Sequence, residues 1–151
     1  MSKKKIVAVK TRDKETLNIV NWHSALKTAP ADPTTGIKRV PLAGDTKIMV
    51  GVVELQPGRK MEAHVHNNGI EIFHTLKGRG EVYTGSQEGE IVFWNDPLKI
   101  KAGDVFSIEP GMVHQLRNLS DKQSLFLTFS CPLSHFCADL TLVEGFPINT
   151  G

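Results

Sequence analysis

Short apolar stretches rich in Val, Ile and Phe alternate along most of the chain with turns that contain glycine or proline. These breaks come too often for long amphipathic helices, and the stretches between them have the length and composition of β-strands. The pattern predicts ten strands, at residues 37–40, 47–55, 61–66, 70–76, 80–85, 90–94, 98–102, 105–108, 114–118 and 124–130. Short strands separated by frequent turn signals favour an all-β sandwich or barrel.

Some of these predicted strands are apolar on both faces. Alternation along residues 47–55 places Ile48 and Val52 on one face and Met49 and Val53 on the other. A sheet with one face in water would show polar residues on that face instead. We therefore expect the outer face to be covered, either by an N-terminal arm or by a second copy of the chain in a homodimer.

The remaining segments frame this β-rich body. Residues 13–28 have apolar positions that suit a short helix or an arm, and the proline-rich stretch that follows reads as a connector. The expected organisation is an N-terminal arm and linker over residues 1–35, a β-barrel over 36–131, and a C-terminal extension over 132–151 that packs on the barrel.

The composition is that of a single globular domain, with 151 residues, 40% of them hydrophobic and 23% charged. No apolar run approaches the ~18 residues that span a bilayer, and too few apolar residues follow Lys3, Lys4 and Lys5 for a secretory signal, so we expect a cytoplasmic protein without a membrane partner. Its net charge of +2 is dispersed and predicts no nucleic-acid binding. Cys131 and Cys137 are too few for a disulfide framework, so both are expected to be reduced.

The run HVHNNGIE contains the first candidate site. His64 and His66 are two apart in a predicted strand, so their side chains project to the same face, roughly 6 to 7 Å apart along the backbone. In an unbroken strand, Glu71 would fall on the opposite face. The intervening Asn67-Asn68-Gly69 tolerates the positive φ of a tight turn. The chain can therefore reverse and begin a neighbouring strand, from which Glu71 faces the same interior.

A fourth candidate ligand is His114, which begins a predicted strand after the turn at Pro110-Gly111. Three imidazoles and one carboxylate suit one first-row divalent ion, with Fe, Mn, Ni, Zn and Cu all possible. A purely structural zinc site would be closed and richer in cysteine. On an octahedral ion, two positions would stay open for water, dioxygen or a chelating substrate, which predicts chemistry or ligand capture.

These residues resemble the two sequence motifs of the cupin superfamily. The first, G-x5-H-x-H-x3,4-E-x6-G, is met by Gly58, His64, His66, Glu71 and Gly78. The second, G-x5-P-x-G-x2-H-x3-N, is met by Gly103, Gly111, His114 and Asn118, with Glu109 in its proline position and Pro110 one place later. The resemblance covers roughly residues 36–131 and implies a small single-domain cupin. Such a chain is a double-stranded β-helix, or jelly roll, that binds one metal through His64, His66, Glu71 and His114.

Four other residues are candidates for the pocket. Glu62 stands two before a histidine of the predicted strand, so alternation brings it to the pocket face as a general base, or leaves it as a rim carboxylate. Tyr83, the one tyrosine, is a candidate catalytic phenol, with a packing role as the alternative. Phe73 and Thr75 share the inward parity of the candidate glutamate and are expected to line the cavity.

Other polar and aromatic residues are expected outside the site. His74 has the opposite parity to the candidate glutamate, and His23 and His135 have no partners at ligand spacing. Phe93 and Trp94, in the segment between the two motifs, could form a lid but more often such residues pack.

The preferred functional hypothesis is a metal-dependent cupin enzyme acting on a small oxygen-rich molecule, such as an organic acid, a diketone or an enediol. Dioxygenase-type oxidoreductase chemistry leads because it is frequent among cupins that keep three histidines and the glutamate, which is an argument by analogy. Isomerase, lyase or decarboxylase chemistry is one alternative. A non-catalytic module that binds a sugar or metabolite beside its metal is the other.

Overall fold

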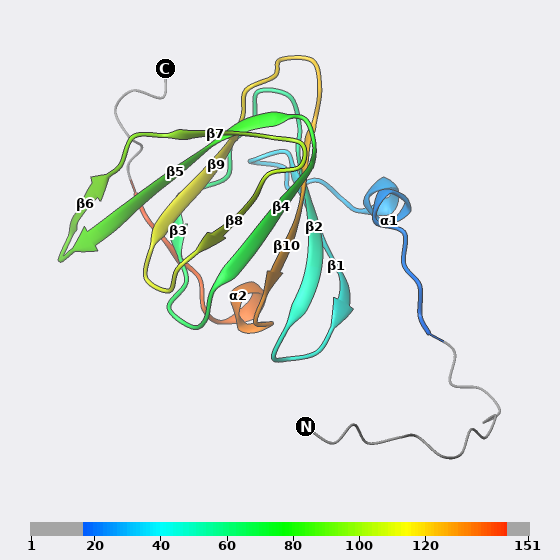
Figure 1. Cartoon of the computed structure of the whole chain (residues 1–151), viewed down its shortest axis with the longest axis horizontal. Helices are drawn as coiled ribbons and strands as arrows, with labels where there is room; N and C mark the ends of the chain where they lie inside the picture. Colours follow the sequence, from blue (N-terminus) through cyan, green and yellow to red (C-terminus); the bar gives the residue numbers. More distant parts are fainter. Residues whose placement is uncertain (1–16, 145–151) are drawn as a thin grey trace, which may run out of the picture.

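A computed structural model describes residues 17–144 of the chain. Two antiparallel sheets pack face to face (Figure 1). The five-stranded sheet, in the order β1-β2-β10-β4-β8, contains β1 (Ile37–Gly44), β2 (Met49–Leu55), β4 (Glu71–Lys77), β8 (Val105–Ile108) and β10 (Leu125–Cys131). The six-stranded sheet, in the order β11-β3-β9-β5-β6 with β7 beside β5, contains β3 (His64–Val65), β5 (Arg79–Glu88), β6 (Ile91–Trp94), β7 (Leu98–Lys101), β9 (Val113–Asn118) and β11 (Thr141–Leu142). The fold is the predicted all-β double-stranded β-helix.

All ten predicted strands are present, although the one predicted over residues 61–66 is reduced to β3. The short strand β11 was not predicted, because two exposed residues carry no alternation signal. Of the predicted arm, residues 13–16 lie outside the described residues, as do the N-terminal lysines and residues 145–151 of the C-terminal extension.

Alternation along the strands builds the core between the sheets. In β2, Met49, Val53 and Leu55 face inward, and in β10 the inward side chains are Leu125 and Leu127. They meet Val82, Ile100 and Leu116 from the six-stranded sheet. Each fully buried aliphatic side chain contributes roughly 1.5–3 kcal/mol, so this apolar interior is the main source of folding free energy.

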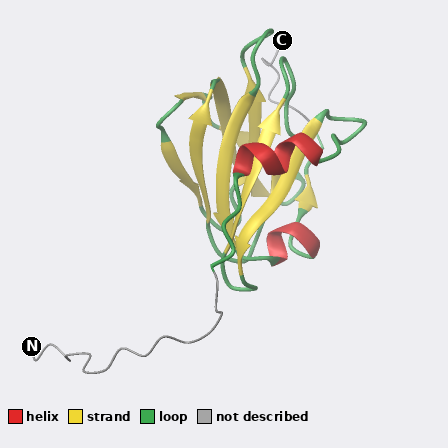
Figure 2. Ribbon diagram, turned by 90° about the vertical axis from the view of Figure 1, so that its right-hand side faces the viewer, coloured by secondary structure: helices red, strands yellow, loops and turns green. Residues whose placement is uncertain are grey.

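The N-terminal arm covers one part of the outer face of the five-stranded sheet. Its helix α1 (Trp22–Thr28) is capped by Asn21, whose side chain accepts a hydrogen bond from the amide of Ser24 (2.9 Å). The helix lies against β1 and β2 (Figure 2), and its Trp22 ring is 5.4 Å from the Phe126 ring on β10. Elsewhere on this face Ile72 and Val105 are exposed, so the arm covers only part of it.

Two short features complete the described chain. Helix α2 (Ser134–Cys137) follows β10 and precedes β11. No helix within residues 17–144 is long and apolar enough to cross a membrane.

Candidate metal centre

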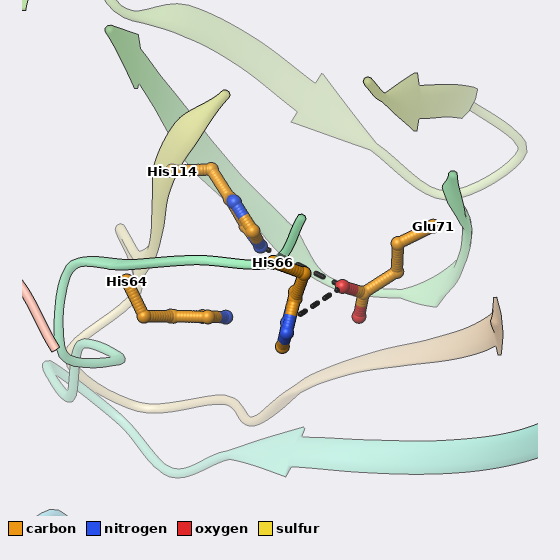
Figure 3. Close-up of side chains that lie close together, drawn as sticks. All are labelled: His64, His66, Glu71 and His114. Atoms are coloured by element: carbon orange, nitrogen blue, oxygen red, sulfur yellow. Dashed lines mark ion pairs between the residues drawn. The ribbon is translucent and has the colours of Figure 1, made fainter. Parts of the chain in front are cut away.

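Four polar side chains converge at one end of the barrel interior (Figure 3). His64 on β3 and His114 on β9 are directly opposite each other in the six-stranded sheet, and their ring centroids are 4.2 Å apart. His66 follows β3 immediately, and Glu71 is the first residue of β4 in the other sheet. All four residues are buried. The four residues of the predicted ligand set therefore lie together.

The turn between His66 and Glu71 works differently from the prediction. Strands β3 and β4 do not pair with each other, because they belong to different sheets. The Asn67-Asn68-Gly69 turn, with Gly69 at φ 73°, is a corner that carries the chain from one sheet to the other. Glu71 consequently faces the histidines across the interior instead of from the next strand.

The distances suit a single ion. The Oε2 atom of Glu71 lies 3.2 Å from Nε2 of His66 and 3.6 Å from Nε2 of His114. One candidate ligand atom from each of the four residues lies within 4.8 Å of all the others. Two ligand atoms that are each ~2.1 Å from a shared ion lie roughly 3.0 to 4.2 Å apart. The cluster therefore needs little adjustment to hold a first-row divalent metal.

Backbone carbonyls fix the orientation of the three imidazoles. The Nδ1 atoms of His64 and His114 lie 2.8 Å and 3.0 Å from the carbonyl oxygens of Glu62 and Met112, and Nδ1 of His66 bonds to the carbonyl oxygen of Asp139. A carbonyl only accepts, so each Nδ1 carries the hydrogen and donates it. In the neutral rings, every Nε2 then keeps a lone pair for the interior, as metal-binding histidines require.

Buried polar atoms without partners also indicate a ligand at this place. Glu71 Oε2 and His114 Nε2 are buried and have no hydrogen-bond partner among the described residues. Such atoms cost free energy unless they are paired. A cation between them would satisfy both, so the donor set fits a bound metal.

Burial and neighbouring groups shift the ionisation of the cluster. Burial, with the nearby His114 ring as the next contribution, lowers the pKa of His64 from 6.5 to about 3. Burial alone would raise the pKa of Glu71, but the imidazoles of His114, His135 and His66, whose facing nitrogens can carry protons where no ion is bound, outweigh it and hold that pKa well below its usual range. A neutral His64 and an ionised Glu71 are the forms that bind metals.

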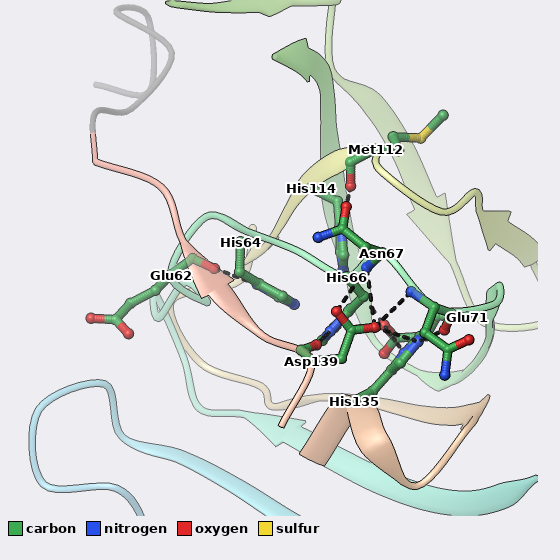
Figure 4. Close-up of polar contacts among 10 residues, drawn as sticks. Glu62, His64, His66, Asn67, Glu71, Met112, His114, His135 and Asp139 are labelled. Atoms are coloured by element: carbon green, nitrogen blue, oxygen red, sulfur yellow. Dashed lines mark hydrogen bonds and ion pairs between the residues drawn. The ribbon is translucent and has the colours of Figure 1, made fainter. Parts of the chain in front are cut away.

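The expectation that His135 has no partners at the site is wrong. This residue of α2 is 3% exposed, and its Nδ1 atom lies 3.7 Å from Glu71 Oε2. Its ring stacks on the His66 ring, with centroids 4.0 Å apart and planes 5° apart (Figure 4). Spacing could not reveal this, because α2 folds back from beyond the last barrel strand. The C-terminal extension therefore contributes to the site.

The two candidate catalytic residues, Glu62 and Tyr83, take the alternative roles expected for them, at the rim and in packing. Glu62 precedes the short β3, so strand alternation does not apply to it, and its exposed side chain points away from the cluster (Figure 4). Thr84 of β5 is opposite His114, so its neighbour Tyr83 points to the other face of the sheet. The Tyr83 hydroxyl donates to Glu81 Oε2 at 2.6 Å. Neither side chain is placed as a base or acid at the centre.

Of the two side chains expected to line the cavity, Phe73 does so and Thr75 does not. Phe73 faces inward on β4 and lines the cavity among the ligands, and Thr75 is buried on the same face deeper in the barrel, away from that cavity. His74 is exposed on the outer face. Phe93 and Trp94 lie on the hairpin of β5 and β6, and neither lines the cavities at the site.

Two neighbouring spaces lie beside the cluster. The inner cavity, about 10 Å³, is bordered by the ligands His64, His66 and Glu71, which is about the room that one water molecule or ion takes. The outer cavity has a volume of about 640 Å³ and reaches His64 from the side of the linker and β11. Arg39, Met61 and His64 line both spaces.

Arg39 was not singled out by sequence reasoning. It lies opposite the buried Val53 in the pairing of β1 with β2, so its side chain is on the inward face of this edge strand. Its guanidinium lies 4.6 Å from the centre of the Phe136 ring. Among residues 17–144, Arg39 forms no ion pair. The alternation in IKRV was the sequence signal that could have shown its side chain to face inward.

The family follows from the sequence match as well as from this geometry. The family described as "Cupin domain" matches residues 51–130, more than half of the chain. The chain belongs to the cupin family. The match begins in β2 and ends in β10, so it includes all four members of the metal-ligand cluster.

Solved structures share the cupin fold at low sequence identity. An uncharacterised protein with a double-stranded β-helix domain from Klebsiella pneumoniae has a TM-score of 0.62 and 23% identity, covering 86% of this cupin and 100% of that chain. The cupin domain of Cnp3 from Schizosaccharomyces pombe has a TM-score of 0.56 and 20% identity, covering 70% of this chain and 64% of that one. An oxalate oxidase has a TM-score of 0.59 and 18% identity, covering 82% and 64%.

The cupin thus spans less than two thirds of the Cnp3 and oxalate oxidase chains. At these identities the similarity establishes the shared fold. No curated protein matches the sequence.

Proposed function

We propose that this cupin is a metal-dependent enzyme acting on a small organic acid, with His64, His66, Glu71 and His114 as the metal ligands. The observation that carries the proposal is the set of three Nδ1–H bonds to backbone carbonyls. They leave three Nε2 lone pairs directed to one point beside a buried carboxylate. A bound divalent ion would supply Lewis-acid activation and, if redox-active, oxygen chemistry.

The charges beside the candidate metal ligands favour an acid group at that end of the molecule among the small oxygen-rich molecules considered. The two positive charges of a divalent ion exceed the one negative charge of Glu71, and Arg39 adds a fixed positive charge where the cavities meet. A guanidinium binds a carboxylate through two parallel hydrogen bonds. Asp32 and Glu62 line the outer cavity, where they suit hydroxyl groups of the same molecule. A cavity of about 640 Å³ is ample for a metabolite-sized acid.

The lining of the inner cavity bears on the type of reaction. Apart from the ligands, Arg39 and His135, it is formed by apolar side chains and Cys131. Burial raises the pKa of the Cys131 thiol to about 12, so it is neutral. Glu62 and Tyr83 are directed elsewhere, and the two ring nitrogens of His135 face the Asn68 carbonyl and the Glu71 carboxylate. Reactions that depend mainly on the metal, oxygen-dependent oxidation first and decarboxylation second, therefore fit better than isomerisation by a protein base. The structurally similar oxalate oxidase is named for the oxidation of a small acid.

Elemental analysis of protein purified without added metal, followed by oxygen-uptake and CO₂-release assays on a panel of small hydroxy, keto and dicarboxylic acids, tests this proposal. We expect about one equivalent of a first-row metal and turnover of at least one acid. Absence of metal binding, even after addition of Fe²⁺, Mn²⁺, Ni²⁺, Cu²⁺ and Zn²⁺ in turn, would refute it.

The alternative is a non-catalytic module that captures an acid or sugar at its metal. The scarcity of acid–base groups at the centre favours this alternative. It predicts saturable binding of a ligand to the metal-loaded protein without consumption of that ligand over hours.

We also propose that the chain forms a homodimer through the outer face of the five-stranded sheet. Ile72 and Val105 lie on adjacent strands of that face and are 38% and 62% exposed, where α1 does not reach. Light scattering should report twice the chain mass, and Val105→Lys should shift it to the monomer. A monomeric wild type at 100 µM would contradict this part of the proposal.

A further inference from the structure

The three candidate histidine ligands differ in where their orienting carbonyl comes from. His64 and His114 each donate to a carbonyl two residues earlier in their own segment. His66 instead donates to the carbonyl of Asp139, 73 positions away in the chain. Two of the imidazoles are therefore oriented by the barrel strands themselves, whereas the third depends on a segment that follows the barrel.

That segment, residues 132–144, is held against the metal-binding corner by several independent contacts. The Asp139 carboxylate accepts hydrogen bonds from the backbone amides of Asn67 (2.9 Å) and Asn68 (2.7 Å). His135 stacks on His66 and bonds through Nε2 to the Asn68 carbonyl. Strand β11 then pairs with β3, which places Leu142 opposite His64.

We propose that residues 132–144 form a clasp that completes the metal centre, with Asp139 as the positioning residue for His66. The Asp139 carboxylate fixes the turn that follows His66, and its own carbonyl fixes the His66 tautomer and ring orientation. One residue thus holds the ligand from two sides. The inference rests on the proposed metal binding and adds that affinity depends on a segment outside the two sequence motifs and the family match.

The coupling acts in both directions. If the clasp raises the affinity of the centre for metal, the metal must stabilise the closed clasp by the same free energy. The backbone amides of Asn67 and Asn68 donate hydrogen bonds to the Asp139 carboxylate, so their hydrogen-exchange rates report whether the clasp is closed. We expect slower exchange at these two amides in the metal-loaded protein than in the metal-free protein.

Asp139→Ala tests the clasp, and Asp45→Ala is its matched control. The Asp45 carboxylate also accepts hydrogen bonds from two backbone amides, those of Lys47 (2.8 Å) and Ile48 (3.0 Å), but it lies in the hairpin between β1 and β2. Both substitutions remove a carboxylate that accepts hydrogen bonds from two backbone amides, so a general loss of stability affects both, and Asp139→Ala also removes the contact with His135 Nε2 (3.8 Å). Only Asp139→Ala should weaken Co²⁺ and Zn²⁺ binding, by about 10- to 100-fold, and change the visible absorption spectrum of bound Co²⁺.

Asp139→Asn keeps the side-chain shape and one acceptor oxygen. It should recover part of the lost affinity, and it serves as the test variant if Asp139→Ala does not fold. Wild-type Co²⁺ affinity and an unchanged spectrum in both Asp139 variants would overturn the clasp. If the wild-type protein itself binds neither ion, the proposed function fails instead, so the two failures are distinguishable.

Discussion

The two ends of the barrel interior are built from the same strands but differ in chemistry. On β9, His114 faces the metal end, and Leu116, two residues further along the same face, belongs to the apolar core. On β4, Glu71 begins the strand at the metal end, and Phe73 and Thr75 continue its inward face. A step of two residues along each strand therefore separates a polar layer, which contains His114 and Glu71, from an apolar layer, which contains Leu116 and Phe73.

This difference separates stability from function along each strand. The apolar layer gains free energy by leaving water, whereas burying imidazoles and a carboxylate costs free energy unless they find partners. Among residues 17–144, Glu71 Oε2 and His114 Nε2 are buried and have no hydrogen-bond partner. The polar layer should thus add little to the stability of the metal-free fold, and its side chains should be replaceable without unfolding.

The largest expected effect comes from His114→Ala. Loss of this ligand should lower metal affinity by more than the ~100-fold that changes beside a metal can cost, so that stoichiometric metal disappears. The metal-free protein should remain folded and lose less stability than with a truncated core leucine, because removing a buried Nε2 that has no hydrogen-bond partner offsets part of the cost of the cavity. Elemental analysis and urea unfolding in EDTA measure the two quantities. A variant that binds no metal and is also unfolded would argue against the separation of layers.

Leu116→Ala is the matched change in the other layer. Leu116 is fully buried, so its truncation should destabilise the protein by about 2–5 kcal/mol. Metal affinity of the folded fraction should remain near that of the wild type, since the ligands above it are held by their own carbonyls. Urea midpoints and metal titration at a temperature where the variant is folded check this. Loss of affinity as large as that of His114→Ala would show that the two layers are coupled.

The contrast also explains how much of the fold could be predicted from the sequence. Alternation and turn residues predicted ten strands and the closed β architecture, because each signal is local. The partition of strands between sheets is not local, so the Asn67-Asn68-Gly69 corner was mistaken for a reversal within one sheet. The strand β11 is too short to leave a pattern and owes its existence to pairing with β3.

The candidate site shows the same limit. The sequence motifs predicted four side chains that the structure brings together, since motif spacing encodes the barrel geometry. For Glu62 and Tyr83 the sequence left two roles open, and the structure agrees with the rim carboxylate for Glu62 and the packing role for Tyr83. Strand alternation could not decide between them, because Glu62 lies outside the regular strand and the glycines before Tyr83 hide its parity. His135 and Asp139 reach the centre by tertiary contact alone, and no spacing rule relates them to residues 63–72.

Acidification should sharpen the distinction between the layers. The pKa of His64 is about 3 in the folded protein and 6.5 in the unfolded chain. Between pH 3 and pH 6.5, His64 therefore binds a proton in the unfolded state but not in the folded state. The metal-free fold should therefore lose stability by about 1.4 kcal/mol per pH unit from this group as pH falls below 6.5. The lowered pKa of Glu71 acts in the same direction at lower pH, whereas the raised pKa of His135 favours folding near and below pH 6.5.

Urea unfolding in EDTA between pH 7 and 4.5 isolates the contribution of His64 when His64→Asn is measured beside the wild type. The variant should have a shallower pH dependence by close to one proton, while Leu116→Ala should be parallel to the wild type. Equal slopes for His64→Asn and the wild type would mean that His64 is not held neutral by burial.

The smallest expected effect concerns Arg39, which lies where the polar layer opens to the outer cavity. Arg39→Gln should weaken binding of small carboxylic acids to the metal-loaded protein by about 10- to 100-fold, because a charge-assisted hydrogen bond contributes ~1.5–3 kcal/mol. Lys38→Gln removes the same charge one residue away, where alternation directs the side chain to the other face of β1. Calorimetric titration with acids and their neutral amides compares the two variants. Arg39→Gln should abolish the preference for acid over amide and leave metal affinity intact, whereas an equal loss in Lys38→Gln would reduce the effect to general electrostatics and remove Arg39 from the substrate site.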